Sequence, residues 1–225
     1  MKIAVLGTGM VGTTFATKLI ELGHQVTMGS RSAENEAVVQ WRASAGPRAF
    51  AGTFREAASF GDVVFNCTNG ANSLQALRLA GADAIGGKLL LDVANPLDFS
   101  RGIPPSLTVC NTDSLGEQIQ REFPSAHVVK TLNTMNCELM VNPSLVPGDH
   151  VVFICGNEAA AKKEASRYLT EWFGWQPRNI LDLGDITAAR GTEMTLPIWL
   201  RLWNTIGHGH FNFQIVRTPS PATAN

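Results

Sequence analysis

Charged residues are few in this chain, and neither sign of charge is in excess. Asp, Glu, Lys and Arg make up 16% of the 225 residues, and 18 basic residues nearly balance 19 acidic ones, for a formal net charge of −1. Proteins that bind nucleic acid or an acidic membrane surface need clustered basic residues, and the longest Lys/Arg run is Lys162-Lys163. The composition therefore predicts neither kind of partner. The 44% of hydrophobic residues excludes an intrinsically disordered chain.

Cysteine is scarce as well, and no two cysteines have C-x-x-C spacing. The four in the chain are scattered at Cys67, Cys110, Cys137 and Cys155, which argues against a disulfide scaffold and against a structural zinc site. No apolar run approaches the roughly 18–20 residues that span a bilayer. The strand-like run that begins at Ile3 leaves no room for a signal peptide. We therefore expect a reduced, cytoplasmic protein without a bound metal.

The first thirty residues predict a strand, a glycine-rich turn, a helix and a second strand. The apolar run at residues 3–6 is typical of a strand buried on both faces, and helical apolar spacing then runs as far as Gly23. Between them stands the pattern G-x-G-x-x-G, in which Gly7 allows a tight turn, Gly9 lets a pyrophosphate approach and Gly12 allows close packing. The helix N-terminus would attract the phosphates. We predict that this turn binds a dinucleotide through Gly7, Thr8, Gly9, Met10, Val11 and Gly12.

The residues that follow the second strand indicate which dinucleotide binds. A site that prefers NAD has Asp or Glu here to bind the ribose 2′-hydroxyl, whereas this chain has Gly29-Ser30-Arg31-Ser32. A carboxylate would repel a 2′-phosphate, but a hydroxyl and a guanidinium would bind it. Ser30 and Arg31 therefore predict NADP. The alternative is that both side chains only solvate a loop.

Strand and helix patterns alternate along the rest of the chain. Further strands are expected at residues 62–67, 88–93, 128–132, 151–155 and about 180–181. Capping boxes at Thr53/Glu56 and Ser114/Glu117 are expected to begin helices, and Asn157 is expected to cap a later one. This alternation predicts a Rossmann-type α/β fold with a doubly wound, mostly parallel sheet. We divide it into an NADP-binding domain at residues 1–148 and a small α/β extension at residues 149–225 on the substrate or dimer side.

Three polar loops are expected at the carboxyl ends of strands, where such sheets bind their ligands. They are residues 68–70, 94–96 and 133–136, and residues 97–107 form a further polar loop. Each could be an ordinary connecting loop with turn chemistry. Three together at the ligand edge favour a binding role, and the cofactor contacts that they predict are Thr68, Asn69, Gly70, Ala94 and Asn95.

No convincing acid–base pair for alcohol or hydroxy-acid oxidation is found. The only tyrosine, Tyr168, takes a core position of an expected helix, and Lys130 lies inside an expected strand. Transfer of a hydride between two redox cofactors asks little of the protein beyond holding two rings face to face. The sequence therefore favours that reaction, with no catalytic residue assigned.

The histidines and the last helix leave alternatives open. Three histidines precede expected strands and are predicted at the surface, namely His24, His127 and His150. His208 and His210 are predicted in a loop, with a lesser alternative in which one lines the active site. A helix pattern with Pro197 inside it ends near Ile206 and is apolar nearly all round. It could pack on the sheet, form a dimer interface or line a pocket for a flat ring.

At this point the chain resembles the NADP oxidoreductases that depend on the deazaflavin coenzyme F420. The resemblance rests on the glycine turn, on Gly29-Ser30-Arg31, on the strand end at residues 129–134, on Cys155-Gly156-Asn157, and on Arg190, Glu193 and Pro197. It implies a Rossmann domain with a small C-terminal extension, generally a homodimer, that passes a hydride between NADPH and the deazaflavin ring.

The resemblance also implies roles for individual residues. Thr8, Met10, Ser30 and Arg31 would bind NADP, with Asn69 and Ala94 near the nicotinamide. The deazaflavin site would be lined by Asn133, Met135 and Cys137. The family has His, Ile and Ala at those three positions, so NADP binding carries over better than the identity of the second substrate.

Three functions remain in view at this stage. The leading one is hydride transfer between NADP(H) and coenzyme F420 or a similar flat acceptor. The second is NADPH-dependent reduction of another small molecule, such as an imine, a flavin or a ferric chelate. The third is a non-catalytic module that senses NADPH.

Overall fold

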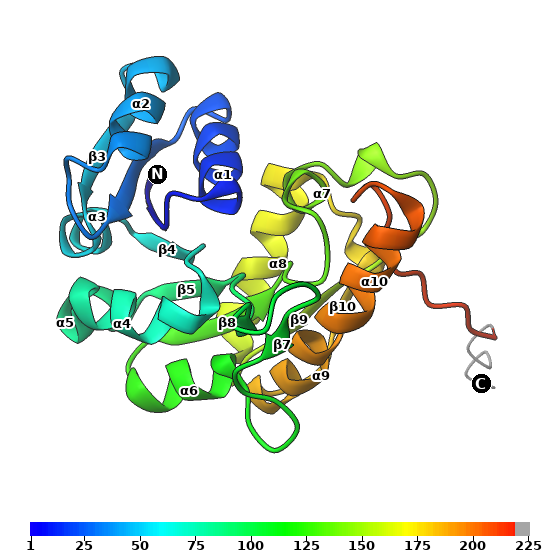
Figure 1. The fold of residues 1–225 in the computed structure, drawn as a ribbon. Coiled ribbons are helices and arrows are strands. Elements are labelled where there is room, and N and C mark those ends of the chain that lie inside the picture. The colour runs from blue at the N-terminus through cyan, green and yellow to red at the C-terminus, as the bar shows by residue number, and fades with distance from the viewer. Residues whose placement is uncertain (219–225) are drawn as a thin grey trace, which may run out of the picture.

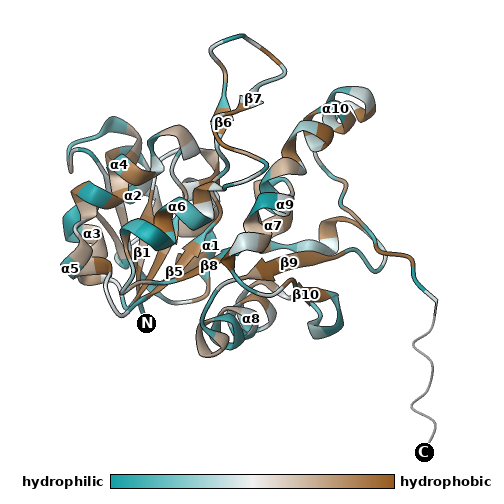
Figure 2. Ribbon diagram, turned by 90° about the horizontal axis from the view of Figure 1, so that it is seen from below, coloured by the Kyte–Doolittle hydropathy of each residue, from teal (hydrophilic) through white to brown (hydrophobic). Residues whose placement is uncertain are grey.

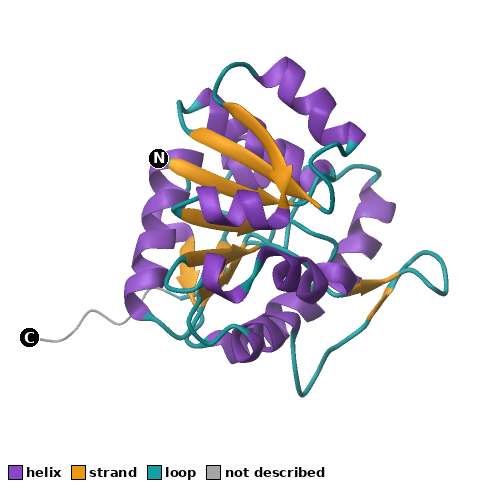
Figure 3. Ribbon diagram, turned by 90° about the vertical axis from the view of Figure 1, so that its left-hand side faces the viewer, coloured by secondary structure: helices purple, strands orange, loops and turns teal. Residues whose placement is uncertain are grey.

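The fold is built on one eight-stranded sheet with helices on both faces (Figures 1 and 3). The structure is a computed structural model that describes residues 1–218. All neighbouring strands are parallel except β8 and β9, so the predicted doubly wound, mostly parallel sheet is confirmed. Across the sheet the strands are β10 (Ile180–Asp182), β9 (Val152–Cys155), β8 (His127–Thr131), β5 (Leu89–Asp92), β4 (Val63–Asn66), β1 (Lys2–Leu6), β2 (Gln25–Ser30) and β3 (Ala49–Thr53).

Two hydrophobic clusters cover the two faces of this sheet. On one face the cluster joins the strands to α1 (Met10–Glu21), α2 (Glu36–Ala45), α7 (Cys137–Val141) and α8 (Ala159–Phe173). On the other it joins them to α3 (Phe54–Phe60), α4 (Gly70–Ala80), α5 (Ala82–Ile85), α6 (Leu115–Glu122) and α9 (Ala189–Met194). Residues such as Val5 and Phe65 on one side and Ala4 and Val64 on the other are fully buried, because alternate side chains of a strand face opposite sides of the sheet. Short 3-10 helices lie between these elements at η1 (Pro143–Leu145), η2 (Pro177–Asn179) and η3 (Ile186–Ala188).

The residues between the second strand and Thr53 hold two elements that the sequence patterns did not predict, α2 and β3. Helix α2 begins at Asn35, whose side chain accepts a hydrogen bond from the Val38 amide at 3.4 Å. Only Val38 and Trp41 of this helix are buried, so its apolar stripe is too narrow to stand out in the sequence. Strand β3 then pairs in parallel with β2 at the edge of the sheet.

Two of the three predicted helix caps differ from expectation. The box at Thr53 and Glu56 forms as predicted. Ser114 caps α6, but the Glu117 carboxylate does not return to the Ser114 amide, because it accepts hydrogen bonds from the Ser114 hydroxyl and from Arg190 at 2.8 Å. A charged donor forms the stronger bond with a carboxylate.

Asn157 and His150 also correct the sequence-based expectations. Asn157 does not cap α8, because the N-cap of that helix is Glu158. Instead, the Asn157 side chain accepts a hydrogen bond from the Ile186 amide at 3.1 Å. His150 is buried rather than at the surface, because its Nε2 faces the Pro143 carbonyl at 2.9 Å and its ring packs edge-on against Trp175. Both residues bind segments that are distant in the sequence.

Residues 97–107 form a short hairpin, not a plain loop. Strands β6 (Leu97–Asp98) and β7 (Ser106–Leu107) pair antiparallel, and the hairpin projects from the body of the molecule (Figure 2). Its tip exposes 84% of Ile103. Two-residue strands are below the length at which an alternating pattern can be recognised.

The chain after residue 148 continues the same sheet, since β9 pairs with β8 and β10 pairs with β9. The division of the chain at that residue stays a prediction. As expected from Pro197, the last helical pattern is interrupted, and α9 gives way to α10 (Leu196–Ile206) at Thr195.

Helix α10 stands away from the sheet (Figure 2). Only Leu196 of this helix is buried, while Ile198, Trp203 and Ile206 each keep more than two fifths of their surface exposed. The alternative in which α10 packs on the sheet is therefore wrong. The homodimer implied by the resemblance stays a prediction. Among residues 1–218, none of the helices has the length and apolar character to cross a membrane.

Candidate active site

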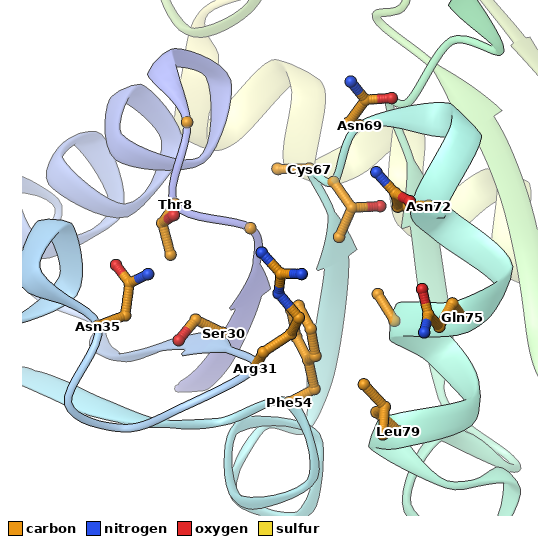
Figure 4. A pocket seen from close by; sticks show the side chains of 14 residues that line it. Thr8, Ser30, Arg31, Asn35, Phe54, Cys67, Asn69, Asn72, Gln75 and Leu79 are labelled. Carbon is orange, nitrogen blue, oxygen red and sulfur yellow. The ribbon is translucent and has the colours of Figure 1, made fainter.

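Two adjoining cavities lie at the carboxyl ends of the parallel strands. The first, of about 290 Å³, is enclosed by the β1–α1 turn, the end of β2 and helix α4, and Figure 4 shows this pocket. The second, of about 320 Å³, lies between the N-terminus of α1, the ends of β5 and β8, the β6–β7 hairpin and α10. They share three lining residues, Cys67, Thr68 and Asn69. The cavities therefore form one cleft in two parts, joined at the end of β4.

Nearly all the predicted site residues line this cleft. The first cavity takes Gly7, Thr8, Gly9, Ser30 and Arg31, and the second takes Met10, Val11, Gly70, Ala94, Asn95, Asn133, Met135 and Cys137, while Thr68 and Asn69 line both. Gly12 alone lies outside it. The polar loops that the sequence placed at the ligand edge are thus brought together by the parallel strands that precede them.

The three glycines of the turn differ in what they provide. Gly7 has φ of +118°, where side chains are rarely tolerated. A Cβ on Gly12 would lie 2.1 Å from the Gly7 carbonyl oxygen, so this glycine allows helix and turn to pack closely. A Cβ on Gly9 would meet nothing within 4 Å, which leaves open space at the N-terminus of α1. No side chain caps that N-terminus, so its amide groups can bind an anion.

Ser30 and Arg31 lie at the end of β2, opposite α4 across the first cavity. Figure 4 shows the Arg31 guanidinium extending into the cavity above Phe54, with Thr8 on one side and Asn72 on the other. Within residues 1–218, Arg31 forms no salt bridge. Its charge is therefore available to a ligand. The buried Ser30 hydroxyl donates to the Ser32 carbonyl and shapes the loop beside it.

The sequence analysis missed several residues of the first cavity. They come from α4, from the start of α3 and from the N-cap of α2, namely Asn35, Phe54, Asn72, Gln75, Ala76 and Leu79. On α4 the residues 72, 75, 76 and 79 have the spacing of one helical stripe, and half of the Leu79 surface is exposed. Polar residues at helical spacing after a ligand-edge loop could have indicated this wall.

A buried ion-pair cluster lies beneath the second cavity. The Lys130 ammonium is 2.8 Å from Asp92 and 2.8 Å from Glu193, and it donates its third hydrogen bond to the Ala94 carbonyl at 2.5 Å. Burial by itself lowers the pKa of Lys130, but the two carboxylates outweigh burial and raise it above its ordinary value. The ammonium thus stays charged and holds the loop at residues 94–96 in place.

A chain of hydrogen bonds leads from this cluster to the joint between the cavities. Asp92 accepts from the Asn66 side-chain amide at 2.8 Å, and the Asn66 oxygen accepts from the Thr68 hydroxyl at 2.7 Å. The Ser73 hydroxyl is 2.6 Å from that of Thr68 and 3.2 Å from the Asn66 nitrogen. Asp92, Asn66 and Ser73 are completely buried.

The three predicted loops are in direct contact with one another. Gly70 approaches Asn95 so closely that a Cβ would lie 1.9 Å from the Asn95 carbonyl oxygen. Asn95 and Asn133 form two hydrogen bonds, at 2.8 and 2.9 Å. Leu132 has φ of +63°, an unusual conformation for leucine that directs the chain from β8 towards Asn133. The three loops that line the second cavity are therefore held in place by contacts with one another.

The walls of the second cavity are mostly apolar. Hairpin residues Leu97 and Phe99 line it together with Leu196, Trp199 and Leu200, so α10 forms part of the pocket as one alternative proposed. Trp199 stacks on Phe211 with ring centroids 5.3 Å apart. Across both cavities the ionisable lining side chains are Arg31, Cys67 and Cys137. Burial raises the pKa of the Cys67 thiol well above its ordinary value, so Cys67 lines the joint as a neutral group.

Neither His208 nor His210 lines the cleft. His210 lies 2.5 Å from Glu138 on α7, and Gly209 passes close to Asn136. The described part of the chain holds no group of three or more His, Cys, Asp or Glu side chains arranged for a metal ion. His210 therefore ties the C-terminal segment to α7, while the His208 ring accepts a hydrogen bond from the His210 amide within that segment.

Comparisons with known proteins agree with this geometry. The family model described as NADP oxidoreductase, coenzyme F420-dependent, matches residues 2–96. A solved structure from Arthrobacter sp. FB24, described as that of a candidate F420-dependent NADP-reductase, is 53% identical, covers 96% of this chain and 100% of that one, and has a TM-score of 0.90.

Two more distant relatives extend the comparison. Metalloreductase STEAP3 from Rattus norvegicus is 30% identical over 204 residues, which is 88% of this chain but 38% of that protein, so this chain spans well under half of that relative. The reductive aminase of Aspergillus terreus, in complex with NADPH and ethyl levulinate, shares the fold with a TM-score of 0.62 at 18% identity, covering 92% of this chain and 62% of that one. With a full-length relative at 53% identity, the chain belongs to the family of F420-dependent NADP oxidoreductases.

Proposed function

We propose that this protein transfers a hydride between NADP(H) and a flat two-electron acceptor, and that coenzyme F420 is that acceptor. One observation carries the proposal: a cavity suited to phosphates meets a mostly apolar cavity, and their ionisable lining residues are one arginine and two cysteines. Such a site can hold two rings face to face, but it supplies no side chain to move a hydroxyl proton. Hydride transfer between two redox-active rings needs only that the site hold the two rings face to face.

The first cavity supports binding of the adenosine half of NADP(H). The free amides at the start of α1 would bind the pyrophosphate, with open space over Gly9 for its approach. The unpaired Arg31 guanidinium lies where a 2′-phosphate would need a counter-charge. Across the cavity, Asn72, Gln75 and Leu79 of α4 offer polar and apolar contacts to a base.

The second cavity supports binding of the nicotinamide and of the acceptor ring. Asn95 and Asn133 hold each other and form its polar side, next to Met135 and Cys137. Phe99 and Trp199 form its apolar side, and aromatic faces pack well against flat rings. The mostly apolar lining of this cavity suits two stacked rings, and the proton that accompanies the hydride would come from solvent.

The direct test mixes the purified protein with NADPH and oxidised coenzyme F420. We expect the deazaflavin absorbance to decay at a rate that depends on both substrates. Protein that binds NADPH but leaves this absorbance unchanged would exclude F420 and retain the cofactor assignment.

A second candidate is NADPH-dependent reduction of another small molecule, and one observation favours it. The curated relative at 30% identity is named a metalloreductase. A panel of ferric chelates, flavins and imines, followed through NADPH oxidation, separates this candidate from the first. Binding of NADPH without turnover of any acceptor would instead favour the sensing module.

A further inference from the structure

Thr68 lies where the two cavities meet, at the end of a buried hydrogen-bond chain whose directions are set by a charge. This hydrogen-bond chain begins at the Asp92 carboxylate, which can only accept hydrogen bonds. Asn66 must therefore turn its amide nitrogen towards Asp92, at 2.8 Å, and its second N–H faces the Ser73 hydroxyl at 3.2 Å. With both amide protons used, the orientation of Asn66 is determined.

The orientation of Asn66 in turn determines that of the two hydroxyls. The Asn66 oxygen can only accept, so Thr68 donates its single proton to it at 2.7 Å. Because the only proton of Thr68 is used on Asn66, Ser73 must be the donor in the 2.6 Å contact between the two hydroxyls, while it accepts from the Asn66 nitrogen. A hydroxyl has one proton and two lone pairs. Thr68 is thus left with one lone pair for a ligand and no proton.

We propose that Thr68 is a specificity-determining residue that accepts a hydrogen bond from a donor on the nicotinamide riboside half of NADP(H). That donor is either the carboxamide N–H or a ribose hydroxyl, since with the pyrophosphate at the start of α1 both groups would come near the joint of the cleft. A phosphate oxygen, which is itself an acceptor, cannot replace it. This inference rests on the proposed function, because it takes NADP(H) as the ligand.

A Thr68 hydroxyl that donated to a ligand instead of to Asn66 would be energetically unfavourable. For Thr68 to donate to a ligand, the buried Asn66 oxygen would keep only the Thr68 amide, at 3.4 Å, and a buried acceptor without a good partner is unfavourable. Lys130 holds the other end of the chain, because its ammonium pairs with Asp92 at 2.8 Å. Lys130 therefore acts as a positioning residue for Thr68 through Asp92 and Asn66.

The test compares dissociation constants of the wild type, Thr68→Val and Thr68→Ser for NADP and two analogues. One analogue carries 3-acetylpyridine in place of nicotinamide and lacks the N–H donor; the other lacks the hydroxyls of the nicotinamide ribose. We expect Thr68→Val to weaken NADP binding about tenfold and Thr68→Ser to restore it. The analogue that lacks the true donor should bind the wild type about tenfold less tightly than NADP. Its affinity should not fall further in Thr68→Val, because the hydrogen bond is already absent.

Two controls separate this role from a structural one. Ser73→Ala removes a fully buried hydroxyl of the same hydrogen-bond chain and leaves Thr68 still an acceptor towards a ligand, so the discrimination between NADP and the analogues should persist. The fragment 2′,5′-ADP lacks the nicotinamide riboside that carries the proposed donor, so Thr68→Val should bind it as tightly as the wild type does.

Two results would overturn the assignment of Thr68. One is an equal loss in Thr68→Val for NADP and both analogues, and the other is no loss for NADP. In either case the wild type would still bind NADP and 2′,5′-ADP, so the proposed function would stand. If the wild type bound neither nucleotide, the proposed function itself would be wrong.

Discussion

Lys130 and Glu193 form a buried ion pair, with 2.8 Å between Nζ and Oε1. Lys130 belongs to β8, under the second cavity, and Glu193 belongs to α9, after the last strand of the sheet. The same carboxylate accepts the amides of Leu115 and Gly116 at the start of α6, at 2.8 and 3.0 Å. One side chain of the C-terminal extension thus satisfies a helix N-terminus and the ammonium that holds the site loops.

Replacement of this ammonium should destabilise the fold strongly. Lys130→Met would leave two buried carboxylates, Asp92 and Glu193, without their counter-ion, and breaking such a pair costs about 3–5 kcal/mol. Denaturant unfolding measures the loss. The matched control is Arg178→Met, which breaks an exposed pair with Asp149 and should change little. Equal losses in the two variants would contradict a structural role for the buried cluster.

The pair of Glu117 and Arg190 should make stability depend on pH in the acid range. Hydrogen bonds from Arg190 lower the pKa of Glu117, against the opposing effect of burial. A carboxyl whose pKa is lower in the folded state stabilises the fold fully above its unfolded pKa of about 4.3, and this contribution is lost as the pH falls through the folded value. The difference in unfolding free energy between wild type and Glu117→Gln should therefore be constant near pH 7 and shrink below about pH 4. A difference that stayed the same down to pH 3 would rule out this linkage.

Two alanine substitutions in the glycine turn should affect different properties: Gly12→Ala the stability of the fold, and Gly9→Ala the affinity for NADP. Gly12→Ala places a Cβ 2.1 Å from the Gly7 carbonyl oxygen, and such overpacking costs about 1–3 kcal/mol or more. Gly9→Ala meets no atom of the protein within 4 Å, so its thermal unfolding should match the wild type while its NADP affinity falls. Thermal scans and NADP titrations of both variants provide the comparison. Full NADP affinity in Gly9→Ala would mean that the pyrophosphate does not lie over this residue.

Arg31→Ala should change the choice of nucleotide. One hydrogen-bonded charge contributes about 1.5–3 kcal/mol, so the KM for NADPH should rise by about 10- to 100-fold while that for NADH stays near its original value. Steady-state kinetics with both nucleotides measure the ratio. Arg42→Ala, which removes an exposed arginine of α2 outside the cavity, serves as the control. A parallel rise for NADPH and NADH would remove Arg31 from the 2′-phosphate site.

The part of the site that the sequence predicted best is built from local patterns. The glycine turn, Ser30-Arg31 and the loops after β4, β5 and β8 were all located, because parallel strands bring their carboxyl ends to one edge and each strand is a short apolar run. The wall formed by α4 was missed, because the helical spacing of Asn72, Gln75 and Leu79 after a ligand-edge loop is a weak signal until the opposite wall is known. The return bond from Glu117 to Ser114 and the cap at Asn157 were misjudged for a related reason: distant segments supply other partners, because Arg190 donates to the Glu117 carboxylate and the Ile186 amide donates to Asn157.

By itself the amino-acid sequence determined the alternation of strands and helices and the place of the glycine turn, and it predicted NADP as the nucleotide, because each depends on neighbours within a few turns of chain. The tertiary structure alone decided that Glu193 pairs with Lys130, that α10 lines the second cavity, and that the Thr68 hydroxyl donates to Asn66. These relationships join residues from separate strands and helices. Burial of the Lys130 charge requires a carboxylate partner such as Glu193, which the local sequence does not reveal.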